Sequence, residues 1–445
     1  MITGQWDVEF RRDGAVYDDE QVVALLGGLE GASDLLVVSH GWNNNIEQAK
    51  ELYDELLERF EVLPQPERGP GSRVAVMRVF WPSKKFTPED LIPGGGVASA
   101  GDSTGEEDAA VRAIEVLRTD PLVLGGEDTE PVAAPDLDRA AELVPQLEFS
   151  ATARRDFVLS IRSALNPDEA HPDDATAEFF SADPEELFRA FELPAPLVPP
   201  TGQGGGTANL SIGGLPSLGD MFTGPRAAAR RIANFATYYR MKTRAGTVGR
   251  GGVAATLLRI RQQHPELPIH LVGHSFGGRL VVAAASSLPG GKVPVTLTLL
   301  QAAFSHNGLA PMFDGEHDGA FRRVVQVPTV TGPIVITHTK HDTAVGIAYP
   351  LASRIARDTL AALGDQDDPY GGMGRNGAQN TPEVDDGEQS VRTELYSYRF
   401  APGKVYNLNA DGAVRDHSDV KGIPIANVIL SNMTAGGDWV PTPAV

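Results

Sequence analysis

Residues 268–278 read PIHLVGHSFGG, and this stretch decides the fold. The apolar, β-branched residues 269–273 predict a strand, and the small-residue run 276–286 predicts a helix that begins shortly after it. The turn between them, residues 273–277, matches the pattern GxSxG with Ser275 at its centre. Such a turn holds a serine hydroxyl exposed at the positive end of a helix, and only small flanking residues permit it. The stretch therefore predicts an α/β fold in which Ser275 is a nucleophile.

A strand–helix–strand pattern lies near the N-terminus. Residues 35–39 form a continuous apolar run that ends in serine, as expected for a strand buried on both faces. The asparagines at 43–45 offer a helix cap, and apolar residues over 46–60 recur at helical spacing. Residues 74–80 supply the next strand, and residues 6–10 form a shorter β-like run. Because a β–α–β order implies parallel strands, we expect a mostly parallel central sheet flanked by helices.

The C-terminal half continues this alternation of strands and helices. We predict helices over 226–240, 252–264 and 344–363, strands over 295–300 and 333–337, and strand-like runs over 395–400 and 405–408.

The middle of the chain differs from both ends in its amino-acid composition. Residues 84–223 are acidic and rich in proline and glycine, with helical patterns over 137–147 and 151–165 and a capped helix start at Asp183. We interpret this stretch as a helical and irregular insertion, a lid or cap, and a linker between two domains is the alternative. The expected organisation is a first core segment over 1–83, the insertion over 84–223 and a second core segment over 224–445.

Composition and charge narrow the class of protein. Hydrophobic residues at 41% and charged residues at 22% are ordinary for a globular protein. A formal charge of −21 repels phosphate backbones, so we expect no nucleic-acid partner. The absence of cysteine excludes disulfides, thiolate metal sites and a cysteine nucleophile. No apolar run reaches membrane-spanning length and no signal peptide is visible, so a cytoplasmic location is expected, although a processed secreted chain would look the same.

The stretch 268–278 resembles the nucleophile elbow of the lipase and esterase branch of the α/β-hydrolases. The resemblance extends over the two core segments and leaves out residues 84–223. It implies an α/β-hydrolase fold and a catalytic triad in the chain order serine, acid, histidine.

The serine needs a base, and the chain has ten histidines. His417 follows the last predicted strand near the chain end, in the run AVRDHSDVKG, where the resemblance places the triad histidine. His338 and His341 lie too close to the predicted acid strand to reach over from a separate loop. We therefore expect His417 to be the base.

The acid is expected at Asp342. This residue follows the apolar strand 333–337 in the run PIVITHTKHDTAVG, which resembles the acid loop of the same family. Its carboxylate would accept a hydrogen bond from His417 and fix the tautomer of the imidazole. Asp314 and Asp318, on the preceding loop, are the alternative acids.

Two backbone N–H groups are expected to form an oxyanion hole. One belongs to Phe276, immediately after the nucleophile. The other belongs to Trp42, because His40, Gly41 and Trp42 directly follow an early strand and resemble the HG-x oxyanion motif of the family. Trp81, Phe304 and His306 also follow predicted strands, and we expect them to border the same cleft and to shape substrate binding.

The leading functional hypothesis is cleavage of a carboxylic ester through an acyl-enzyme on Ser275. The substrate would be a small molecule with a hydrophobic acyl group, and neither a cofactor nor a metal is expected. An acyltransferase or amidase with the same triad is an alternative, because the triad does not choose the acceptor. A non-catalytic α/β-hydrolase scaffold used for binding is the third hypothesis.

Overall fold

Eight strands pair into a single sheet. The computed structural model describes residues 2–42, 44–63, 73–83, 103–124, 129–131, 135–174, 176–192, 223–291, 293–327, 329–342, 369–387 and 389–434. Every neighbouring pair of strands in this sheet is parallel. In spatial order the strands are β1 (Ile2–Glu9), β3 (Val74–Phe80), β2 (Asp34–Ser39), β6 (Ile269–His274), β7 (Val295–Leu300), β8 (Ile334–His338), β10 (Val405–Asn409) and β9 (Gln389–Ser390). The expected α/β class with a parallel sheet is confirmed.

Both faces of the central strands β2, β3, β6 and β7 are buried, which explains why these strands are rich in apolar residues along their whole length. Along β2, Leu35 and Val37 point into one hydrophobic cluster, and Leu36 and Val38 point into another. A strand alternates its side chains between two faces, so a strand covered on both sides shows no polar alternation.

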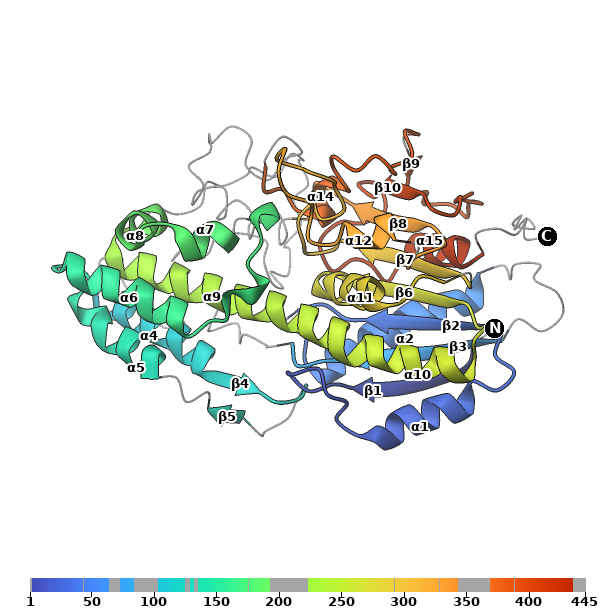
Figure 1. Cartoon of the computed structure of the whole chain (residues 1–445), viewed down its shortest axis with the longest axis horizontal. Helices are drawn as coiled ribbons and strands as arrows, with labels where there is room; N and C mark the ends of the chain where they lie inside the picture. Colours follow the sequence, from blue (N-terminus) through green and yellow to red (C-terminus); the bar gives the residue numbers. More distant parts are fainter. Residues whose placement is uncertain are drawn as a thin grey trace.

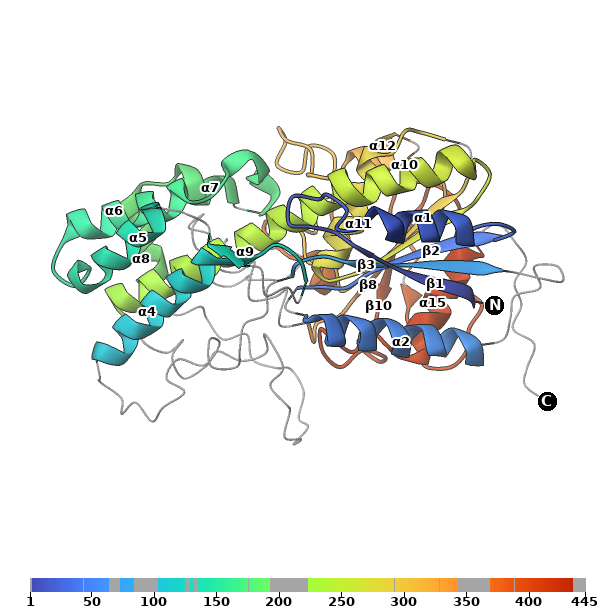
Figure 2. The ribbon, with the colours of Figure 1, turned by 90° about the horizontal axis from the view of Figure 1, so that it is seen from below.

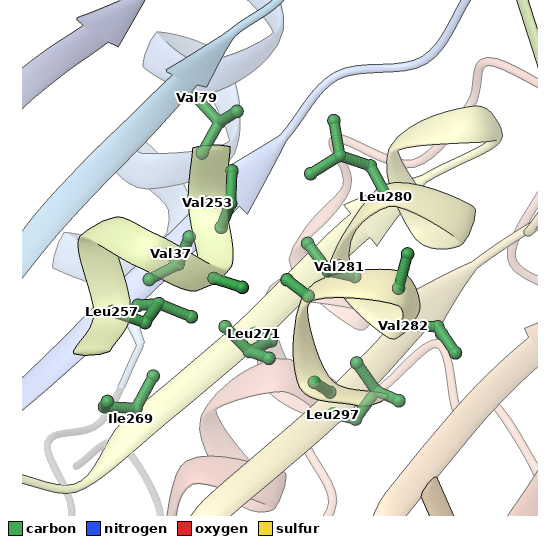
Figure 3. Close-up of a cluster of buried hydrophobic side chains, with 14 of the residues drawn as sticks. Val37, Val79, Val253, Leu257, Ile269, Leu271, Leu280, Val281, Val282 and Leu297 are labelled. Atoms are coloured by element: carbon green, nitrogen blue, oxygen red, sulfur yellow. The ribbon is translucent and has the colours of Figure 1, made fainter. Parts of the chain in front are cut away.

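Helices cover the two faces, as Figure 2 shows. One face carries α1 (Asp19–Gly28), α10 (Ala254–Gln263) and α11 (Phe276–Ser287), and the other carries α2 (Ile46–Val62) and α15 (Ile423–Met433). In Figure 3 the side chains of α10 and α11 meet those of the strands beneath them, with Leu257, Val281, Val37, Leu271 and Leu297 in one cluster. The sequence analysis did not predict α1 or α15. Because α15 is buried nearly all round, it has no polar face to give a helical period.

The parallel arrangement brings several loops to one edge. The strands β2, β6, β8 and β10 all end there. The segments that leave this edge include 40–45, 275–276, 339–342 and 410–422. In parallel sheets, binding and catalytic groups gather at the carboxyl ends of the strands.

A group of helices lies beside the sheet (Figure 1). Its core is formed by apolar side chains that include Phe157, Phe188 and Phe235. Its helices are α4 (Ser103–Arg118), α5 (Pro135–Leu143), α6 (Ala151–Ser163), α7 (Thr176–Ser181), α8 (Pro184–Glu192) and the first half of α9 (Pro225–Thr247). The predicted cap of α8 is confirmed, because Asp183 Oδ1 accepts hydrogen bonds from the first-turn amides. We call α4–α8 the helical unit.

Smaller elements complete the described chain. They are β4 (Thr119–Pro121) and β5 (Thr129–Pro131), the 3₁₀ turns Val144–Gln146, Pro167–Glu169 and Pro172–Asp174, and the short helices α12 (Arg323–Gln326) and α14 (Met373–Asn376). No helix among the described residues is long and apolar enough to cross a membrane.

The helix α9 joins the helical unit to the sheet. The two helices predicted over 226–240 and 252–264 are one continuous helical run, because α9 passes through a π-helical turn, Val248–Val253, into α10. The glycines in this turn do not end the helix. They allow the turn to pack closely against α11. A Cβ atom on Gly249 would collide with the carbonyl oxygen of Leu280 on α11.

The predicted strand over 395–400 is wrong. Its aromatic residues pack together, with Phe400 5.5 Å from Tyr398 and 4.9 Å from Tyr406 between ring centroids. Backbone amides nearby donate to tyrosine hydroxyls, as from Ala401 to Tyr406, and not to a neighbouring strand. The alternation therefore reflects aromatic packing at the sheet edge. The helix predicted over 344–363 lies outside the described residues.

Buried ion pairs fasten the helical unit to the core. Lys242 of α9 is 1% exposed and its ammonium contacts the carboxylate of Asp174, the hydroxyl of Thr176 at 3.1 Å and the carbonyl of Glu169 at 3.3 Å. Glu169 also accepts from Arg279 of α11 at 3.3 Å. Burial lowers the pKa of Lys242, and Asp174 opposes that shift. Each of these groups can stay charged inside the protein because a group of opposite charge contacts it.

We expect Lys242→Met to lower the free energy of unfolding by about 3–5 kcal/mol, because it leaves the Asp174 carboxylate buried without its cation. Chemical denaturation measures this loss. The exposed Lys404→Met is the matched control, with a change within about 0.5 kcal/mol. Adding Asp174→Asn to Lys242→Met should recover part of the stability, and equal losses in the single and double variants would contradict the role of the pair.

Candidate active site

The turn at Ser275 joins β6 to α11. Its φ is 56° and its ψ is −124°, in a region that residues other than glycine rarely adopt. The backbone is held there by three hydrogen bonds. The Ser275 amide donates to Leu300 O at 3.0 Å, and Ser275 O accepts from Gly278 at 2.9 Å and Ala303 at 3.0 Å. The surrounding structure therefore imposes the strained conformation expected of a nucleophile elbow.

The flanking glycines are required by close backbone contacts. A Cβ atom on Gly273 would collide with the carbonyl of Gly277, and one on Gly277 would collide with the carbonyl of Ser39 at the end of β2. The GxSxG pattern is thus a packing requirement of this turn as well as a chemical signature.

The loop after β2 is built on a buried imidazole. His40 Nδ1 lies 2.8 Å from Gly41 O, and since a carbonyl only accepts, Nδ1 carries the proton. His40 Nε2 in turn accepts from the Trp81 amide at 3.4 Å. Burial lowers the pKa of His40 to about 4, so the ring is neutral at physiological pH. The amide of His40 donates to the Tyr53 hydroxyl at 2.7 Å, which ties the loop to α2.

Gly41 lies directly against Ser275. A Cβ atom built on Gly41 would lie 2.7 Å from Ser275 Cβ. The carbonyl of Gly41 is held by His40 and by Asn44 Nδ2 at 3.0 Å. Because the N–H and C=O of a trans peptide point in opposite directions, the Trp42 amide points away from those two side chains.

The backbone amide of Phe276 is the other N–H group that the sequence analysis expected at the site. Phe276 is the first residue of α11, and a helix leaves its first amides without intrahelical acceptors. Its ring packs 5.9 Å from that of Trp42 and 5.2 Å from that of Tyr238 on α9. Aromatic side chains from three separate elements therefore meet beside the turn.

Asp342 and His417 meet although 75 residues separate them. His417 Nδ1 lies 2.8 Å from Asp342 Oδ2, and Asp342 is fully buried. The loops that carry them are tied together, since the Thr339 hydroxyl donates to Asp411 at 2.8 Å. Burial favours a lower pKa for His417, but the charge and the hydrogen bond of Asp342, with a smaller effect of Asp416, outweigh it and raise the pKa.

His417 also contacts the residue before the nucleophile. The ring centroids of His274 and His417 are 4.8 Å apart, and His274 Nε2 lies 2.8 Å from His417 O. The structure thus brings together Ser275, Asp342, His417 and the loop of Trp42 at the carboxyl edge of the sheet.

The two alternative acids lie elsewhere. Asp314 bonds to His317 Nδ1 at 2.7 Å in an exposed loop, and Asp318 accepts from the Met312 amide at 2.9 Å. Neither has a contact with His417 among the described residues.

The residues expected to border a cleft are engaged in packing. Trp81 is fully buried, stacks on His40 at 5.5 Å and donates from its indole to His40 O at 3.0 Å. Phe304 is 1% exposed and packs against Phe321, while His306, also 1% exposed, lies 3.2 Å from Asn376 Nδ2. These three side chains are covered in this conformation, and Trp81 supports the loop after β2.

Sequence reasoning missed the supporting residues. Tyr53 lies within the apolar helical spacing of 46–60, and His274 lies within the pattern GxSxG of 273–277. Their periodicity and position carried no sign of their hydrogen bonds, which depend on the tertiary fold.

Models of protein families, curated proteins and solved structures all give no match to this chain. Within the described parts of the chain, no group of three or more His, Asp or Glu side chains is arranged to hold a metal ion. The arrangement of serine, imidazole, carboxylate and directed amides is of the kind that performs nucleophilic acyl chemistry.

Proposed function

We propose that this chain is a serine hydrolase of the α/β-hydrolase type that cleaves carboxylic esters through an acyl-enzyme on Ser275. The observation that carries the proposal is the 2.8 Å contact between the buried carboxylate of Asp342 and the imidazole of His417, at the strand edge where Ser275 occupies its strained turn.

The tautomer of His417 fits the role of general base. Asp342 accepts from Nδ1, so Nδ1 carries the proton and Nε2 has the lone pair. Nε2 takes the hydroxyl proton of Ser275 as the oxygen attacks the ester carbonyl, and Asp342 stabilises the imidazolium that forms. The same proton then passes to the leaving alcohol. In the second half, His417 takes a proton from a water molecule that attacks the acyl-enzyme, and it returns this proton to the Ser275 oxygen as the ester bond to the serine breaks and the acid leaves.

The oxyanion would be held by the Trp42 and Phe276 amides. Gly41 brings the first within reach of the serine, and the start of α11 supplies the second together with the positive end of the helix dipole. These donors are fixed by the backbone, so little reorganisation is needed when charge develops.

We further propose that residues 84–223 are an insertion whose helical unit caps the site. Tyr238, next to this unit on α9, lies 6.3 Å from Trp42 and 5.2 Å from Phe276 between ring centroids. Of these three rings, Phe276 and Tyr238 are buried and Trp42 is only partly buried, so Trp42 is the ring that an apolar acyl group would contact.

Labelling by a fluorophosphonate tests the proposal. We expect stoichiometric labelling of the wild-type protein, with the adduct located on Ser275 by mass spectrometry, and hydrolysis of aryl esters that varies with acyl chain length. A folded protein that neither labels nor hydrolyses any ester would leave the binding-scaffold alternative. Products formed with added alcohols or amines would instead indicate an acyltransferase.

The variant Gly41→Ala tests the oxyanion loop. The new Cβ atom would lie 2.7 Å from Ser275 Cβ and 3.2 Å from His274 Nδ1, so the loop must move away from the serine. We expect kcat to fall by about 10²–10³-fold, the loss typical of removing one oxyanion donor, with a small change in KM. Steady-state ester hydrolysis measures both.

Gly27→Ala is the matched control, because a Cβ atom at Gly27 in α1 meets nothing within 4 Å. It should leave kcat unchanged and raise stability by up to about 1 kcal/mol. Equal activity of the two variants would argue against an oxyanion role for the loop.

A further inference from the structure

The side chain of His274 is not used in the chemistry proposed above, yet it contacts the base directly. Its Nε2 lies 2.8 Å from the carbonyl oxygen of His417. A carbonyl oxygen only accepts hydrogen bonds, so Nε2 carries the proton and donates it. His274 thus binds the main chain of His417, and Asp342 binds its side chain.

The other ring nitrogen of His274, Nδ1, lies in an unfavourable environment. Nδ1 is buried and has no hydrogen-bond partner among the residues that the structure describes. It faces the oxyanion loop, where a Cβ atom on Gly41 would lie 3.2 Å away. A buried acceptor without a partner is unfavourable, so an apolar side chain would suit packing better. What the imidazole supplies is the hydrogen bond to His417.

His274 is also held in one charge state. Burial is the main cause that lowers its pKa to about 3, and the nearby imidazoles of His417 and His40 act in the same direction. The ring therefore stays a neutral donor over the pH range in which His417 titrates.

The base needs such an anchor because it lies on a loop. His417 belongs to the segment 410–422 between β10 and α15, and the backbone amides of 413–420 make only short-range turn bonds, such as Asp419 N to Asp416 O at 3.3 Å. The bond from His274 connects this loop to the turn that carries the nucleophile, across 143 residues of chain.

We propose that His274 is a positioning residue that fixes the main chain of His417 beside Ser275, so that the imidazole remains in line with Asp342 and the serine hydroxyl. This role rests on the proposed serine hydrolase function. In this role the histidine of GHSFGG holds the loop of His417, and this role is separate from shaping the turn at Ser275.

A matched pair of variants separates the hydrogen bond from the packing. In His274→Gln the amide nitrogen lies close to the place of Nε2 and can donate to His417 O. His274→Met has similar length and volume and no donor. Neither variant changes the charge, because His274 is neutral. The readouts are kcat and KM for an aryl ester, and the pKa of His417 from ring ¹⁵N NMR.

We expect His274→Gln to stay within about threefold of the wild type, and His274→Met to lose about tenfold to a hundredfold in kcat with little change in KM. The charged and titratable groups that face His417 are Asp342, Asp416 and His274. Loosening the contact with Asp342 removes the main effect that raises the pKa of His417, so this pKa should fall in His274→Met and not in His274→Gln.

Unchanged kcat and His417 pKa in His274→Met would overturn the positioning role, as would equal losses in both variants. A wild-type protein without esterase activity or labelling would overturn the proposed function. The NMR comparison would still decide the positioning role in that case, because the His417 pKa is measured without turnover.

Discussion

Replacing Ser275 with alanine is expected to lower kcat/KM for ester hydrolysis by about 10⁶-fold, because the covalent route is lost and only binding and the oxyanion donors remain. Fluorophosphonate labelling should disappear altogether. The fold should persist, since alanine keeps the backbone bonds of Ser275 to Leu300, Gly278 and Ala303. The measurements are steady-state kinetics, labelling and thermal unfolding of the same preparations.

Ser286→Ala is the matched control on the same helix. The Ser286 hydroxyl donates to Val282 O on α11 and lies away from the strand edge, so activity and labelling should match the wild type. Residual labelling of Ser275→Ala at the wild-type rate would mean that another residue is the nucleophile.

Asp342→Asn is expected to lower kcat/KM by about 10⁴-fold with little loss of folded protein. An asparagine amide can present its nitrogen to His417 Nδ1, which favours the tautomer with the proton on Nε2. The base then lacks its lone pair toward the serine. Asp314→Asn, in the exposed loop, is the matched control and should retain full activity, whereas the reverse ranking of the two variants would identify the alternative acid.

The same substitution moves the pH dependence in a defined direction. In the wild type the pKa of His417 is raised above its ordinary value of 6.5, so kcat/KM should rise with pH through a midpoint above 6.5. Without the Asp342 carboxylate, burial dominates and lowers this pKa. The acid limb of the remaining activity should therefore shift to lower pH, and an unshifted limb would exclude His417 as the titrating base.

Local patterns predicted most of the sheet. The strands at 74–80 and 295–300 match β3 and β7 residue for residue, because runs buried on both faces have a signal that depends on neither register nor partner. The predictions failed where tertiary contacts decide the outcome. Gly249 lies inside a continuous helical run, where the close approach of α11 leaves no room for a side chain. The aromatic residues of 395–400 alternate along the chain but pack against one another and do not pair as a strand.

The candidate site was predictable in part for the same reason. The turn at Ser275 and the loop at His40 have local signatures, since glycines are needed wherever backbones approach this closely. The partnership of Asp342 with His417 came from chain order and resemblance, because no local pattern joins residues so far apart. The hydrogen bond from His274 to His417 had no signal at all in the sequence.

The continuity of α9 has a mechanical consequence. A helix of 23 residues is about 34 Å long and resists bending, so its two ends move together. Its first half is embedded in the helical unit, and Tyr238 touches the rings beside Ser275. A tilt of the outer helices would therefore move Tyr238 against the rings of Trp42 and Phe276.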